Sequence, residues 1–424
     1  MLMQSSCYCI LQTMTSSLQF QKIRTAQLDN FFSTDTPDPV KFVEVIINEA
    51  VKLEASDVLF EPRQKNLSVR FRIDGVLHLA GEISLETYSQ VSSRIKVLSN
   101  LDLAEKRRIQ EGQFIVEAND AQINFRVEIA KTIYGELIVI RIHELRTIVM
   151  DVAKLGFSQK SHKEYQNMLK QRSGLILVCG PTGCGKTTTI YSTINLLNKD
   201  QNYNIMTIEN PVEFQLEGVN QMQVAQEIDF TFAGGLKAIL RLSPDIVFVG
   251  EIRDKETAGI AVESGLTGQL VLSTLHAEDS IGALYRLLDL GIESYLLNSS
   301  LMGIVAQRLV RVNCSVCKKP YQPEQFEIDL FAQVVGKVPI QLFESIGCEK
   351  CNHLRFKGRI GIFEVLEMNA KVRSLIRNKI SEEELRAKLI EESLLTTLLK
   401  DGLMKAETGL TTVKEVLRNS LRIV

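Results

Sequence analysis

The sequence predicts an α/β fold, in which a mostly parallel sheet covered by helices follows a smaller α+β domain. From about Ile148 to Arg311, apolar runs of strand length alternate with helical segments, an order typical of a parallel sheet with helices on its faces. These runs are 175–179, 205–208, 245–249 and 270–274. Ligands of such sheets bind at the carboxyl ends of the strands. Residues that follow these runs are therefore the first candidates for a site.

The α+β domain is predicted from the pattern of the first part of the chain. Apolar residues recur at helical spacing between Val40 and Glu54, and a second helix is expected at 88–98. Between Val69 and Ile73, apolar residues alternate with Arg70 and Arg72, which predicts a strand. Segments 122–129 and 136–142 are also expected to be strands.

The expected domain boundaries divide the chain into five parts. Residues 1–38, rich in Ser, Thr and Gln, are expected to form a poorly ordered leader. The α+β domain covers 39–147 and the parallel-sheet domain 148–313. A cysteine-containing subdomain at 314–365 and a helical C-terminal region at 366–424 complete the chain, and the helical region includes an amphipathic stretch at 381–390.

The composition is that of an ordinary globular protein. With 45% apolar residues, 24% charged residues and a formal net charge of -2, the chain gives no sign of a nucleic-acid binder. No apolar run approaches the roughly 18 residues that cross a bilayer, and the N-terminus lacks the basic flank and apolar core of a signal peptide. We therefore expect a cytoplasmic protein.

A phosphate-binding loop follows the first run, because residues 180–188 match the pattern G-x-x-x-x-G-K-[ST]. In such loops backbone N–H groups wrap a polyphosphate, the lysine reaches its terminal phosphates, and the following hydroxyl residue, here Thr187, ligates magnesium. A helix is expected over 187–197, so the loop lies at a helix N-terminus, which favours an anion. The residues predicted to bind a nucleoside triphosphate are Gly180, Pro181, Thr182, Gly183, Cys184, Gly185, Lys186, Thr187 and Thr188.

Hydrolysis of a triphosphate also needs a group that orients or deprotonates the attacking water. Glu251 ends an apolar strand and is therefore placed for the metal or the water. Many phosphate-loop ATPases carry an Asp where Gly250 stands, so the metal must be held differently here. Glu209 ends another strand, and Pro211 turns the chain so that Glu213 can face the same cleft. The choice of base between Glu209 and Glu251 stays open.

His276 and Asp279 directly follow the run 270–274. This strand end lies on the ligand side of the predicted sheet. We therefore predict that His276 senses the terminal phosphate.

Two C-x-x-C pairs occur among the eight cysteines of the chain. Four thiolates in tetrahedral reach are the ligand set of a closed structural zinc site. Such a site has no open coordination position, so it stabilises the fold and does not catalyse a reaction. The expected ligands are Cys314, Cys317, Cys348 and Cys351.

The first domain is rich in arginine, with residues Arg63, Arg70, Arg72, Arg94, Arg107, Arg108 and Arg126. Scattered charge of this kind usually forms a solvated face. In an oligomeric ATPase, however, an arginine from another domain or subunit stabilises the transition state. Arg70 and Arg72 are the candidates, since they project from one face of one strand.

These elements together resemble the GspE/PilB type of bacterial secretion and pilus-assembly ATPases, within the type II/IV secretion ATPase family. The likeness covers about residues 40–420. In the first domain it is carried by 56–57, 61–62 and 70–75. Further along, the phosphate loop is followed by 208–213, similar to the Asp box, 250–254, similar to Walker B, and 273–276, similar to the His box. Segment 306–311, the cysteine pairs and segment 358–364 complete the match.

The resemblance implies a RecA-like phosphate-loop ATPase domain, preceded by a PAS-like α+β domain and followed by a tetracysteine zinc subdomain and a helical C-terminus. It also implies a cytoplasmic homo-hexamer that uses ATP, magnesium and zinc and moves the first domain against the nucleotide domain. That motion drives pilin or pseudopilin assembly through an inner-membrane platform protein, so peripheral membrane association through partners is expected. The cysteine pairs favour the assembly or secretion type over the retraction type.

Several positions depart from the family pattern. Asn210 stands where the Asp box has Asp, Leu59 where the first domain commonly has His, and Gln113 where an Arg is usual. Leu242-Ser243 replaces a polar Gln-Asp pair. The family's first N-terminal domain, which docks to a membrane partner, is expected to be absent.

Two other functions stay open at this point. The altered arginine motif suggests a scaffold that binds nucleotide with little turnover. A DNA-uptake or nucleic-acid translocase is the other alternative, although the near-neutral charge and the lack of a basic stripe with aromatics weigh against direct contact with nucleic acid. Whether a pilus, a secretion system or DNA uptake is served stays open as well.

Overall fold

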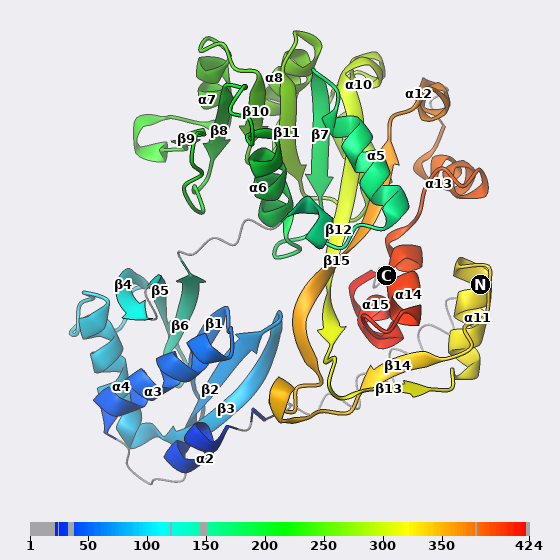
Figure 1. Ribbon diagram of the computed structural model, residues 1–424. Coiled ribbons are helices and arrows are strands. Elements are labelled where there is room, and N and C mark those ends of the chain that lie inside the picture. The colour runs from blue at the N-terminus through cyan, green and yellow to red at the C-terminus, as the bar shows by residue number, and fades with distance from the viewer. Residues whose placement is uncertain are drawn as a thin grey trace. The chain divides into compact units, whose positions relative to one another are not determined.

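The computed structural model describes residues 22–23, 25–32, 38–118, 121–144, 151–377 and 380–420. The chain forms two compact units, the first mostly from residues before 148 and the second mostly from residues after it. Each unit is built around its own large sheet (Figure 1). Most of the expected leader lies outside the described residues, and its described part includes helix α2 (Ala26–Phe32), whose Leu28 is buried.

The first unit contains a six-stranded sheet in the order β3-β2-β1-β6-β5-β4. Its strands are β1 (Asp57–Pro62), β2 (Asn66–Ile73), β3 (Val76–Ser84), β4 (Gln110–Ala118), β5 (Ala121–Thr132) and β6 (Gly135–Glu144). Neighbouring strands are antiparallel. Helices α3 (Pro39–Lys52) and α4 (Leu85–Leu98) pack against each other and contact the sheet. Both predicted helices and all three predicted strands of this region are confirmed, whereas β1, β3 and β4 were not predicted.

The second unit contains a seven-stranded sheet in the order β15-β12-β7-β11-β10-β8-β9. Its strands are β7 (Gly174–Cys179), β8 (Ile205–Glu209), β9 (Asn220–Gln223), β10 (Ile246–Val249), β11 (Leu270–Leu275), β12 (Leu301–Asn313) and β15 (Phe356–Glu367). The pairings from β12 through β7, β11, β10 and β8 to β9 are all parallel. The predicted parallel sheet is thus confirmed, and all four predicted strands lie in it.

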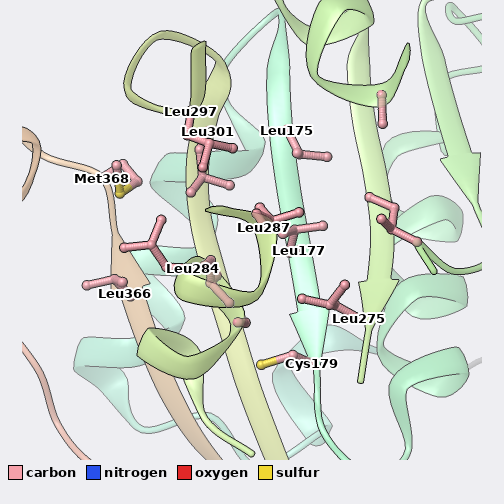
Figure 2. Packing of buried hydrophobic residues seen from close by; sticks show 14 of the residues in the cluster. Leu175, Leu177, Cys179, Leu275, Leu284, Leu287, Leu297, Leu301, Leu366 and Met368 are labelled. Carbon is pink, nitrogen blue, oxygen red and sulfur yellow. The ribbon is translucent and has the colours of Figure 1, made fainter. Parts of the chain in front are cut away.

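Helices and two buried clusters cover this sheet. The helices are α5 (Gln159–Leu169), α6 (Lys186–Leu197), α7 (Phe232–Ile239), α8 (Lys255–Leu266), α9 (Ser280–Asp289) and α10 (Ser294–Ser300). Side chains of a strand alternate between the two faces, so Leu175, Leu177 and Cys179 join one cluster while Ile176 and Val178 join the other. Figure 2 shows part of the first cluster, including Leu284 and Leu287 from α9.

The remaining elements lie in the last third of the chain. A small antiparallel sheet pairs β13 (Lys318–Tyr321) with β14 (Leu342–Ser345). The helices are α11 (Gln325–Val334), α12 (Ala370–Arg377), α13 (Glu382–Glu391), α14 (Leu398–Glu407) and α15 (Val413–Ser420). Helix α13 confirms that the stretch expected at 381–390 is helical. Among the described residues, no helix is both long and apolar enough to cross a bilayer.

The buried strand β7 gives a direct test of the core. Leu177 is 0% exposed in the first cluster, so Leu177→Ala should lower the free energy of unfolding by about 2–5 kcal/mol through lost burial and a new cavity. The matched control Leu266→Ala, at a side chain that is 42% exposed, should change it by less than about 0.5 kcal/mol. Urea unfolding measures the change in the free energy of unfolding for both variants, and amide hydrogen exchange of β7 measures the same change locally. Equal midpoints for the two variants would contradict the assignment of this core.

Candidate nucleotide-binding site

The register of the parallel strands brings the predicted site residues to one edge of the sheet. Leu275 of β11 lies beside Cys179 of β7, and Ser273 of β11 lies beside Val249 of β10. Val249 in turn lies beside Ile208 of β8. The residues that come next along these strands therefore share the carboxyl edge, where ligands of parallel sheets bind. They are Gly180, His276, Gly250, Glu251 and Glu209.

The phosphate loop connects β7 to α6 and depends on glycine at two points. Gly185, just before the first residue of α6, has φ 90° in the left-handed region that favours glycine. A Cβ on Gly180 would lie 2.5 Å from Cys184 Sγ and 2.7 Å from the Gln307 carbonyl oxygen. Both positions therefore exclude larger side chains.

The loop's other predicted residues differ in exposure. Pro181, Thr182 and Gly183 are exposed, while Thr187 and Thr188 are half-buried in the first turn of α6. Lys186 folds over the loop, and its Nζ donates to the carbonyl oxygens of Gly180 (2.8 Å) and Pro181 (3.0 Å). These contacts place the lysine beside the backbone that would surround a polyphosphate.

Cys184 is the one thiol within this loop. It is buried. Burial raises the pKa of this thiol, against the opposing charges of Lys186 and Arg308. Cys184 is therefore a neutral packing residue in the loop.

Gln307, on the neighbouring strand β12, braces the phosphate loop and was not predicted as a site residue. Its side chain is buried, and its Nε2 donates to the Cys184 carbonyl oxygen at 2.7 Å. Its Oε1 accepts from Thr189 Oγ1 of α6 at 2.8 Å. One amide thus ties the loop to the helix that follows it. The segment 306–311 was part of the sequence resemblance, which was the available signal for this residue.

Glu251, His276 and Arg253 form a polar group at the same edge. Glu251 Oε1 pairs with Arg253 Nη2 at 2.6 Å, and its Oε2 lies 3.6 Å from His276 Nε2. The Glu251 side chain is 14% exposed, so it remains accessible to a small reactant. The structure thus brings together the two residues that were predicted to orient the water and to sense the phosphate.

The surroundings of His276 favour the neutral form of its ring. Burial lowers its pKa, and the ammonium group of Lys186 lowers it further, against the opposing charge of Glu251. The ring can therefore donate through one nitrogen and accept through the other.

Glu209 lies at the same edge but is enclosed by hydrogen bonds. Tyr191 Oη donates to its Oε2, while Thr207 Oγ1 (2.6 Å) and Gln221 Nε2 (3.1 Å) donate to its Oε1. Burial and the neighbouring carboxylate raise the pKa of Tyr191, so this hydroxyl stays protonated and able to donate. Glu209 is 3% exposed, whereas Glu213, expected in the same cleft, is exposed.

Gly250, which stands where many phosphate-loop ATPases carry an Asp, is closely surrounded by backbone. A Cβ there would lie 3.2 Å from the Ile208 carbonyl oxygen and 3.3 Å from Glu209 Cα. Thr274 Oγ1 also donates to the Gly250 carbonyl oxygen at 2.7 Å. An acidic side chain at this position would therefore require the neighbouring backbone to shift by a few tenths of an ångström.

Arg70 and Arg72 have carboxylate partners within the first unit. Arg72 lies directly opposite Asp57 in the sheet and pairs with it at 3.1 Å, and Arg141 pairs with the same carboxylate. Arg70 pairs with Glu61, which also binds Arg63 at 3.0 Å. Both arginines are therefore held in their own sheet by ion pairs.

The four cysteines of the two C-x-x-C pairs come together. The Sγ atoms of Cys314, Cys317, Cys348 and Cys351 all lie within 4.8 Å of one another. A tetrahedral zinc ion with Zn–S bonds of about 2.3 Å would separate its sulfurs by about 3.8 Å, and the Cys348 and Cys351 sulfurs lie 3.8 Å apart. The donor set and its spacing therefore fit zinc.

Known proteins resemble this chain over most of its length. The family model for type II/IV secretion system proteins matches residues 34–418. The type II secretion system ATPase E of Vibrio cholerae is 41% identical over 91% of this chain and 76% of its own length. The type IV pilus assembly ATPase PilB of Myxococcus xanthus is 38% identical over 95% of this chain and 72% of its own length.

A solved structure supports the fold independently. The Legionella pneumophila ATPase DotB superposes with a TM-score of 0.67, covering 94% of this chain and 98% of that one at 18% identity. At that identity the likeness shows the α/β fold alone, which confirms the predicted fold class. The family model, which matches residues 34–418, establishes that this chain belongs to the type II/IV secretion system protein family.

Proposed function

We propose that this chain is an ATP hydrolase that powers the assembly of pilin or pseudopilin filaments in type IV pilus biogenesis or type II secretion. The observation that carries the proposal is the convergence of the phosphate loop, Glu251 and His276 at one edge of the parallel sheet. Phosphoryl transfer to water needs little more than such positioning and charge. Relatives at 41% and 38% identity are named ATPases of type II secretion and of type IV pilus assembly.

The residues at this edge divide the work of hydrolysis. The phosphate-loop backbone from Gly180 to Gly185 holds the phosphates, and Lys186 balances the charge at the terminal one. The Thr187 hydroxyl, in the first turn of α6, would hold magnesium, which neutralises charge on the phosphates when bound. Glu251 orients the attacking water, and the neutral ring of His276 contacts the terminal phosphate.

We assign the water-orienting role to Glu251 rather than to Glu209. Both oxygens of Glu209 already accept hydrogen bonds from its own unit, and the residue is buried. Glu251 faces Arg253 and His276 and keeps part of its surface open. Glu209 then serves to fix the end of β8 beside the site.

The hydrolysis would be converted into movement of the first unit, which carries Arg70 and Arg72. We propose that the chain works as a homo-hexamer and that these arginines reach the nucleotide of a neighbouring subunit by leaving their partners Asp57 and Glu61. An arginine supplied in this way stabilises the charge of the transition state. The motion would be passed to an inner-membrane platform protein, so that the chain is held at the cytoplasmic face through its partners.

We also propose that Cys314, Cys317, Cys348 and Cys351 hold a structural zinc ion. Their sulfurs are close enough for tetrahedral ligation, and four thiolates leave no position for a reacting water. The ion would therefore stabilise this part of the chain and take no part in hydrolysis.

Replacing Glu251 tests the motor. Glu251→Gln should lower kcat by about 100-fold or more, since it removes the charge that orients the water. Nucleotide affinity should stay within about twofold, because the phosphate loop is untouched. Phosphate release and fluorescent-nucleotide titration measure the two quantities. The control Glu256→Gln, whose carboxylate is exposed and pairs with Lys237, should match the wild type.

Other outcomes would point to another function. A wild type that binds nucleotide but releases phosphate no faster than Glu251→Gln would favour a nucleotide-binding scaffold. Turnover stimulated by single-stranded DNA at physiological salt would favour a translocase.

Metal analysis tests the zinc site. Purified protein should contain one zinc ion per chain, and a chelator should lower its thermal midpoint, because ligand binding stabilises the folded state. Cys348→Ser should lose most of the metal, whereas Cys7→Ser, at a cysteine outside the two pairs, should retain it. Full metal content in Cys348→Ser, or none in the wild type, would reject the site.

A further inference from the structure

The turn that carries His276 is tied down from several sides. Arg308 Nη2 donates to the Glu278 carbonyl oxygen at 2.7 Å, and Cys179 Sγ donates to the Asp279 carbonyl oxygen at 3.4 Å. Ser280 donates through its backbone nitrogen (2.9 Å) and its hydroxyl (2.6 Å) to Glu364 of β15. The segment 276–280 is therefore a fixed element rather than a free loop.

The buried carboxyl group of Glu364 has a raised pKa. Burial raises this pKa, while the hydrogen bonds that Ser280 donates lower it. The carboxyl group is buried and accepts both hydrogen bonds through one oxygen, Oε1. The turn is thereby attached to a strand next to β12 in the sheet.

A cation from the C-terminal helical region also reaches this turn. Arg386 of α13 lies 2.9 Å and 3.0 Å from the two carboxylate oxygens of Asp279, through its Nη2. The same carboxylate caps α9, since its Oδ1 accepts from the Gly282 nitrogen at 2.8 Å. Arg386 also pairs with Glu382 one turn earlier on α13. The two side chains are 27% and 14% exposed, which limits screening of the pair by water.

Helix α13 holds Arg386 in a defined place. Leu385 and Leu389 of this helix are buried in the first core cluster, and α13 packs against α9. At its start, Tyr285 Oη of α9 donates to the Ile380 carbonyl oxygen, and Ser381 caps the helix by accepting from the Glu384 nitrogen at 3.2 Å. The position of α13 is thus linked to the position of α9 and of the turn before it.

We propose that Arg386 is a positioning residue for hydrolysis, which holds the Asp279 turn so that His276 faces Glu251. The proposal rests on the function argued above. It adds that a displacement of α13 would move the turn that carries His276, through the ion pair between Arg386 and Asp279. Among the described residues, the ion-pair partners of Arg386 are Asp279 and Glu382, and neither belongs to the phosphate loop. Arg386 acts through the two residues, Ala277 and Glu278, that separate Asp279 from His276.

The effect should fall on turnover and not on nucleotide binding. His276 Nε2 lies 3.6 Å from Glu251 Oε2, and a shift of about 1 Å in a reacting group can cost up to about 100-fold in rate. The contacts of Lys186 and Gln307 that shape the phosphate loop come from other elements. Removing Arg386 leaves them in place.

The first test compares variants of one helix. Arg386→Met keeps the apolar stem but removes the cation, and we expect kcat to fall about tenfold or more with KM within about twofold. Arg386→Lys should recover much of the loss. Lys388→Met removes an exposed cation of the same helix, which pairs with Glu384 at 2.7 Å, and should leave both constants unchanged. An Arg386→Met enzyme with unchanged kcat would overturn the proposal.

A double-mutant cycle separates positioning from a merely structural role. In a His276→Gln background, Arg386→Met should cause less than about a twofold further change, because the residue through which it acts is already gone. The same fold loss in both backgrounds, together with a lower thermal midpoint, would show that Arg386 only stabilises the fold.

A spectroscopic measurement keeps the test independent of turnover. The chain has five histidines, and the ring resonance of His276 can be assigned by its loss in His276→Gln. Arg386→Met should shift that resonance, and Lys388→Met should not. An inactive wild type with this shift would reject the proposed hydrolysis but keep the positioning. An unmoved resonance would reject the positioning even if the wild type hydrolyses ATP.

Discussion

Parallel pairing in register, from β8 through β10 and β11 to β7, is the constraint on which the site depends. It sets Val249, Leu275 and Cys179 at the ends of their strands and Ile208 one residue before the end of β8. The residues that come next therefore all lie at one edge of the sheet. A slip of one residue would reverse the two faces of a strand and bury its polar side. The two apolar clusters on the faces oppose such a slip. The same strand register therefore satisfies both the packing of the core and the geometry of the site.

Buried polar side chains then join the elements that meet at that edge. Gln307 ties the phosphate loop to α6, Glu209 joins β8 to α6 through Tyr191, and Glu364 holds the turn after His276. A buried polar group is stable only when its hydrogen bonds are satisfied. Each of these residues therefore specifies one arrangement of two elements, which makes the edge rigid before any nucleotide arrives.

Strand β12 joins this edge to the last third of the chain. Gln307 in its middle contacts the phosphate loop, while Asn313 at its end donates to the carbonyl oxygens of Gly409 and Thr411. Arg311 between them pairs with Glu415 of α15. The C-terminal helices are thus linked to the site through contacts of one continuous strand.

The sequence alone determined the features that depend on local pattern: the phosphate loop, the four strands that precede polar residues, the two C-x-x-C pairs and the parallel sheet itself. Apolar periodicity and short motifs report such features directly. It could not reveal β1, whose buried residues do not alternate, or the choice between Glu209 and Glu251. Only the tertiary structure supplied the enclosure of Glu209, the brace of Gln307 and the approach of Arg386 to Asp279. These depend on contacts between residues far apart in the chain, which no local pattern encodes.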